Sequence, residues 1–100
     1  METVGTLIKR YLNNLTRELD LLLHNKRSVE DFISRFHFLI DEMPLGLPEE
    51  VVNEIEDLND VISRYEPNLN ERRKEPVFTG EEEIKEESIK LLEKIKKISI

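Results

Sequence analysis

The fold is decided by residues 65–94, which read YEPNLNERRKEPVFTGEEEIKEESIKLLEK. Pro67 ends any helix that arrives from the N-terminal side. Thr79, followed by Glu82 three residues later, is a capping-box signal for a helix over residues 80–98. The apolar residues of that helix recur at three- and four-residue spacing, and its inner face is Ile84, Ser88, Leu91, Leu92, Ile95 and Ile98. The stretch therefore predicts a helix exit, a polar loop over 67–79 and a closing amphipathic helix.

Three further amphipathic helices are predicted upstream, over residues 4–24, 28–43 and 48–66. Asn25 can adopt the left-handed conformation that ends the first helix, and Ser28 is a good N-cap for the second. Pro44 stops the second helix, and Pro48 suits the first residue of the third. Four one-sided helices with mostly short connections pack most simply as an antiparallel four-helix bundle. We therefore expect an all-α fold with a single domain over residues 1–100.

The net charge of −7 is concentrated in one segment. Residues 36–63 contain no lysine or arginine and hold eight of the 22 acids, while the other 14 acids face 15 bases. A surface of this kind repels phosphate, so nucleic acid is not an expected partner. It favours a basic protein, which the negative field would steer and hold.

Four acids of the third predicted helix lie on the side opposite its apolar stripe, namely Glu49, Glu56, Asp57 and Asp60. Two interpretations stay open, a merely solvated helix face or a docking surface for a basic partner. Asp41 and Glu42 favour the second interpretation. They lie at a helix C-terminus, where the helix dipole disfavours negative charge.

Phe38 lies opposite the core stripe of the second predicted helix. It is either an aromatic anchor for a partner or a residue covered by the 67–79 loop or the N-terminal residues. Ile89 is a similar but weaker outward-facing residue. These two residues support an alternative function, a helical structural or assembly module that self-associates through exposed apolar side chains.

The chain has few residues of the kinds that catalytic or metal sites need. There is no cysteine, and His24 and His37 lie on different helices without the Glu-x-x-His pattern of di-iron bundles. Exposed carboxylates have nothing to raise their pKa values as a general acid requires. We therefore expect no enzyme, no cofactor and no metal. Neither a signal peptide nor a membrane-spanning run is seen, so a cytoplasmic protein that does not enter membranes is expected.

The 67–79 loop carries a basic turn at residues 72–74. The turn either binds an anion or pairs with glutamates of the protein itself, such as those that open the last helix. Three apolar residues are expected to pin the loop to the body, Leu69, Val77 and Phe78. Tyr11 and Tyr65 are expected to cover the core with their rings and to keep their hydroxyls solvated.

From Ser28 onward, over about two-thirds of its length, the chain resembles the colicin D-type immunity family, the small bacterial self-protective colicin-like immunity proteins. The resemblance is carried by SVEDF at 28–32 with Phe36, the acidic third helix, YEPN at 65–68, Arg72 and Arg73, and EEEI at 81–84. The chain departs from the family at 77–80, where it has VFTG in place of an expected aspartate.

The resemblance implies a four-helix bundle and a non-enzymatic function. Such proteins bind a cognate toxin domain tightly, typically a tRNA-cleaving nuclease, and cover its basic RNA-binding cleft with an acidic surface. Independently of the resemblance, the chain without its partner is expected to be a monomer or a homodimer. Together with the charge pattern, this predicts a partner-binding surface made of Phe38, Asp41, Glu42, Glu49, Glu56, Asp57 and Asp60.

Overall fold

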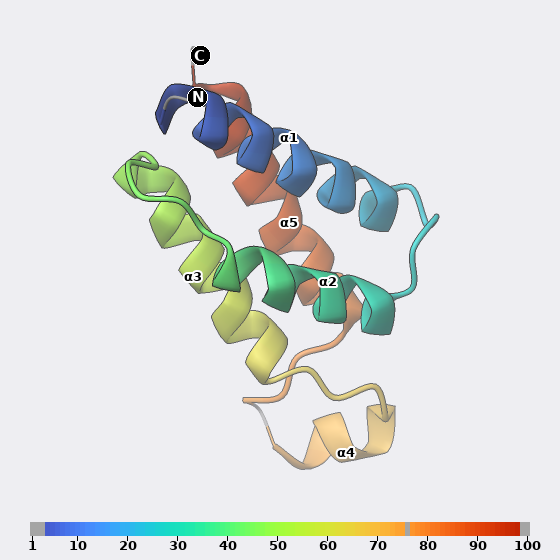
Figure 1. Ribbon diagram of the computed structural model, residues 1–100. Coiled ribbons are helices and arrows are strands. Elements are labelled where there is room, and N and C mark those ends of the chain that lie inside the picture. Colours follow the sequence, from blue (N-terminus) through green and yellow to red (C-terminus); the bar gives the residue numbers. More distant parts are fainter. Residues whose placement is uncertain (1–3, 76, 99–100) are drawn as a thin grey trace.

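The structure, a computed structural model, describes residues 4–75 and 77–98 and is all-helical over them (Figure 1). The all-α prediction is confirmed, since the described residues form no strand and four of the five helices are 7 residues or longer. None of the described helices is long and apolar enough to cross a bilayer. The helices are α1 (Val4–Leu23), α2 (Val29–Asp41), α3 (Glu49–Ser63), α4 (Leu69–Lys74) and α5 (Glu81–Lys96).

Local signals explain most of the helix ends. Asn25 follows α1 with a φ of 58°, the left-handed conformation predicted for it. Ser28 caps α2, because its Oγ accepts a hydrogen bond of 3.2 Å from the backbone N–H of Asp31. Pro48 is the N-cap residue of α3 and so lies one position before the helix. The third helix ends at Ser63, three residues earlier than expected.

The short helix α4 lies within the segment predicted to be a polar loop, so that prediction was wrong for residues 69–74. Asn68 starts the helix: its side-chain Oδ1 accepts hydrogen bonds from the backbone N–H groups of Asn70 (2.9 Å) and Glu71 (3.3 Å). Glu71 in the first turn and the bases in the last turn match the helix dipole. Because no residue of α4 is buried, local capping and charge account for this helix without core packing.

The N-cap of α5 is shifted by one residue from the predicted position, and only the glutamate half of a capping box forms there, because glycine has no side chain. Gly80 is the N-cap residue, and its backbone N–H donates a 2.7 Å hydrogen bond to the Glu83 carboxylate. Thr79, expected to cap this helix, is buried instead. Its hydroxyl donates a 2.8 Å hydrogen bond to the carbonyl of Val61 in the last turn of α3. The Thr79 hydroxyl therefore bonds to a carbonyl at the C-terminal end of α3 and does not cap the N–H groups of α5.

Thr79 also joins the two ends of the α4 segment through its backbone. Its N–H donates to the Arg64 carbonyl (2.8 Å), and its carbonyl accepts from the Glu66 N–H (2.9 Å). These bonds form an isolated parallel bridge between Tyr65 and Thr79. The expected apolar pins are exposed, which corrects the prediction for Leu69, Val77 and Phe78. Hydrogen bonding at Thr79, not burial of these side chains, anchors the segment.

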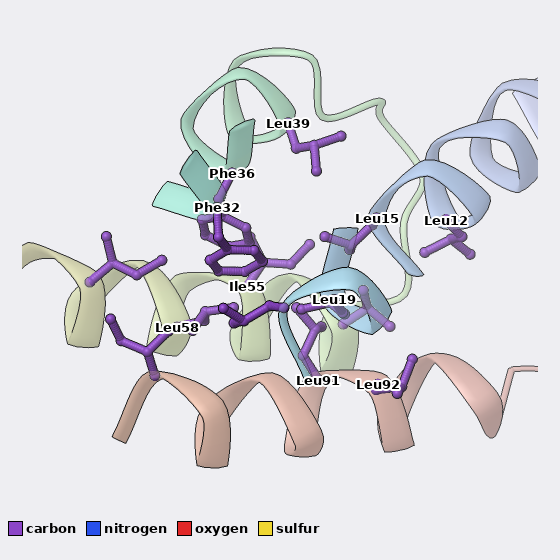
Figure 2. Packing of buried hydrophobic residues seen from close by; sticks show 14 of the residues in the cluster. Leu12, Leu15, Leu19, Phe32, Phe36, Leu39, Ile55, Leu58, Leu91 and Leu92 are labelled. Carbon is purple, nitrogen blue, oxygen red and sulfur yellow. The ribbon is translucent and has the colours of Figure 1, made fainter. Parts of the chain in front are cut away.

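The long helices share one core. α1 packs against both α2 and α5, and α3 packs along α5 (Figure 1). Phe32 and Phe36 of α2 are fully buried and stacked, with ring centroids 5.7 Å apart. Around them, Figure 2 shows side chains from the other three long helices, among them Leu15, Leu19, Ile55, Leu58 and Leu91. This packing fixes which sides of α2 and α3 face outward.

Candidate partner-binding surface

The outward side of α3 is acidic. Its inner side is set by four buried residues, Val51, Ile55, Leu58 and Ile62. The predicted acids on the opposite side are all exposed, and we call them the acidic α3 face: Glu49, Glu56, Asp57 and Asp60. A single rigid helix thus presents four carboxylates to solvent.

Most of the charge on the acidic α3 face is uncompensated. Asp60 pairs with Arg64 at 3.1 Å, one turn further along the chain. Among residues 4–75 and 77–98, Glu49, Glu56 and Asp57 form no ion pair. Like charges at helical spacing repel by about 0.2–0.5 kcal/mol per pair. The face therefore carries a small electrostatic cost that the fold does not need.

Phe38 is exposed over 69% of its surface and lies away from the core. Within residues 4–75 and 77–98, neither the loop nor the start of α1 covers it as the alternative interpretation expected. It lines a groove along the seam of α1 and α2, beside Arg17 of α1, Arg35 of α2 and the C-cap residue Glu42. None of the acids of the acidic α3 face lines this groove. The surroundings of Phe38 are therefore of mixed charge rather than acidic.

Asp41 and Glu42 lie at the exposed C-terminal end of α2. Glu42 is the C-cap residue, and its backbone N–H donates to the carbonyls of the preceding turn. Its side chain lines the groove together with Phe38. The structure thus divides the predicted surface into two parts, the acidic α3 face and a group at the end of α2.

Tyr11 ties α1 to that end of α2. Its hydroxyl is not solvated as expected but donates a 2.7 Å hydrogen bond to the Leu39 carbonyl, one of the carbonyls left without an intrahelical partner. Burial, and then the negative charge of Glu42, raise the pKa of Tyr11 to about 12. The other tyrosine, Tyr65, donates to the Glu30 carboxylate at 3.4 Å.

Stability is expected to fall as the pH rises from 10 to 12. The unfolded Tyr11 loses its proton near pH 10 and the folded one near pH 12, so over this range the unfolded state binds fewer protons and is favoured. Below pH 10 the contribution is fully present. Urea midpoints measured across this range should drop less steeply in Tyr11→Phe, which at neutral pH costs about 1 kcal/mol for the lost hydrogen bond. An equal slope in both proteins would contradict this assignment.

A buried ion cluster joins α1 to α2 and was not predicted from the sequence. Glu18 is only 4% exposed. Its carboxylate lies 3.2 Å from the guanidinium of Arg27 in the interhelical turn and 4.0 Å from that of Arg35 on α2. The available signal was spacing: Glu18 follows Leu15 by three residues and precedes Leu22 by four, which places it at the edge of the apolar stripe.

The basic turn at residues 72–74 belongs to the last turns of α4. Lys74 pairs with Glu71 at 3.0 Å within the same helix. The Arg72 guanidinium lies over Gly80, so close that a Cβ at position 80 would overlap it. Lys74 is therefore paired within the chain, whereas Arg72 lies against the start of α5 with its Nε buried and without a hydrogen bond.

No group of three metal-ligating side chains occurs in the part of the chain that the structure describes. His24 contacts the backbone carbonyl of Asp20 through Nδ1 at 2.8 Å. Comparison with protein-family models, with curated proteins and with solved structures gives no match. A function for this chain is therefore inferred from its own charges and surfaces.

Proposed function

We propose that this chain is a non-enzymatic cytoplasmic protein that neutralises a basic protein partner through its acidic α3 face. The observation that carries the proposal is the row of exposed carboxylates of which Glu49, Glu56 and Asp57 have no ion-pair partner among the described residues. Beyond the helix-dipole contribution of Glu49 in the first turn of α3 and the pairing of Asp60 with Arg64, such a row adds little to the stability of the fold. A cationic cleft, in contrast, would gain attraction and orientation from it.

The partner that we propose is a nuclease toxin domain, in keeping with the resemblance of residues 28–98 to the colicin D-type immunity family. A nuclease that cleaves tRNA must hold phosphates in a basic cleft, and a rigid acidic helix can occupy the same positions. We further propose that the four long helices form an antiparallel bundle. The packing of α1 against α2 and α5, and of α3 against α5, supports this arrangement and makes α3 a rigid carrier for its carboxylates.

The test is a charge reversal on α3. Glu56→Lys, Asp57→Lys and Asp60→Lys combined should slow association at least about 10-fold, because steering by a negative surface is lost. The probe is the product of the gene directly upstream, which the proposal requires to be a basic nuclease toxin. Association is followed by stopped-flow fluorescence and inhibition by a tRNA cleavage assay. Wild-type association should weaken strongly with salt, since exposed charges are screened beyond about 8 Å at physiological ionic strength.

The matched control reverses three exposed acids elsewhere, Glu75, Glu86 and Glu93. It changes the net charge equally but leaves the acidic α3 face intact, so association should stay close to wild type. Circular dichroism should show both triple variants folded. Unchanged association in the α3 variant, or no binding of the wild-type chain to the upstream protein, would refute the proposal.

A further inference from the structure

The groove beside Phe38 continues along the seam toward the N-terminal end of α1 and the C-terminal end of α2. A second depression is lined by Leu7, Arg10 and Tyr11 of α1 and by Pro44 after α2. It shares Asn14 and Glu42 with the depression that holds Phe38. Because the shared residues join them, the two depressions form one continuous surface, which we call the seam groove.

Apolar side chains in and beside the seam groove remain in contact with water. Phe38 is 69% exposed, Leu7 is 41% exposed, and Leu45, which follows Pro44, is 91% exposed. Each of them could be removed from water at a gain of about 25 cal/mol per Å² of apolar surface. Several such residues along one groove indicate a contact surface rather than isolated exposure.

The charges of the seam groove select the occupant. Arg17 and Glu42 are both exposed, and neither forms an ion pair with another described residue. Glu42 lies in the middle of the groove, and Arg17 lies with Phe38 toward one end. A uniformly basic segment would meet Arg10, Arg17 and Arg35. A uniformly acidic one would meet Glu42 in the middle of the groove. A surface carrying the same mixed pattern satisfies both charges.

A second copy of the chain carries this pattern, and a two-fold rotation brings the patch against its own copy, so that a residue i that contacts j is matched by j contacting i. We propose that two copies of this chain associate through their seam grooves about a two-fold axis near Phe38. Arg17 of each copy faces Glu42 of the other, and the two Phe38 rings bury each other. The acidic α3 face takes no part, so this inference stands apart from the proposed function.

The test is sedimentation equilibrium of the full chain over a wide concentration range. The wild-type mass should rise from the 11.9 kDa monomer to twice that value. Arg17→Glu and Glu42→Arg should each weaken the dimer at least about 10-fold, because each places like charges opposite one another at two symmetric points. An equimolar mixture of the two variants should dimerise again, since the heterodimer restores opposite charges at both points.

Two controls separate this interface from general charge effects. Asp57→Lys changes the net charge by as much as Glu42→Arg but lies on the acidic α3 face, so the dimer should be unaffected. Phe38→Ser should weaken the dimer while circular dichroism shows a folded chain. A wild-type chain that stays monomeric at every concentration overturns the proposal and leaves the groove to another partner. A mixture of the two charge variants that remains monomeric overturns the Arg17–Glu42 pairing.

Discussion

Replacing Phe36 with alanine is expected to destabilise the protein by about 3–5 kcal/mol, the usual cost of removing a buried aromatic ring. Phe36 is fully buried, and its ring centroid lies 5.7 Å from that of Phe32. The substitution removes this stacking as well as the buried ring. The four long helices meet around this pair (Figure 2), so no single helix can move to fill the space. Small domains are stable by only about 5–15 kcal/mol, and the variant would be close to unfolding.

The same helix offers a matched control for this substitution. Phe38→Ala removes the same atoms two residues away, but its side chain is 69% exposed. It should change stability by less than about 0.5 kcal/mol when measured by urea denaturation at concentrations where the chain is monomeric. Equal losses for the two variants would mean that the orientation of α2 is wrong.

The second large effect is expected at the buried ion cluster. Arg27→Met leaves Glu18 buried with only Arg35, 4.0 Å away, to balance its charge. Breaking a buried pair from one side costs about 3–5 kcal/mol, and partial exposure of Arg27 places this site at the lower end. Chemical denaturation should show the loss at neutral pH.

A double variant distinguishes the charge from the packing. Glu18→Met combined with Arg27→Met removes both charges and keeps much of the volume, so it should recover most of the stability lost in Arg27→Met. The pair is also imperfectly aligned, because Oε2 of Glu18 and Nε of Arg27 are buried without a hydrogen bond. A double variant no more stable than the single one would assign the loss to packing of the Arg27 stem instead.

The positions of the four long helices were predictable because apolar spacing depends only on the residues of each segment. The helix α4 was not predicted, because six residues are too few to show a hydrophobic period. Its main local signal is the capping side chain of Asn68. The role of Thr79 was predicted wrongly for a different reason. A threonine before a run of acids suits a helix N-cap. In the structure, however, its hydroxyl donates to a carbonyl of α3 that lies 18 residues earlier in the sequence.

Some features of the candidate site could likewise be predicted from the sequence, and others depend on how the helices pack. The outward direction of the acids on α3 and of Phe38 follows from helical periodicity within each helix. The neighbours of Phe38 do not, because Arg17 reaches the groove only through the packing of α1 on α2. Glu18 looked like one more polar residue of α1, and only the tertiary structure brings Arg27 and Arg35 to it.

The bridge between Tyr65 and Thr79 has a consequence for how this protein can be altered. It closes residues 66–78 into a loop whose two ends already meet, so the entropic cost of lengthening the loop grows only slowly. No residue of α4 is buried, and the core does not depend on it. The loop can therefore unfold locally while α3 and α5 stay packed, and a peptide tag or a small reporter domain inserted there should leave the rest of the chain intact.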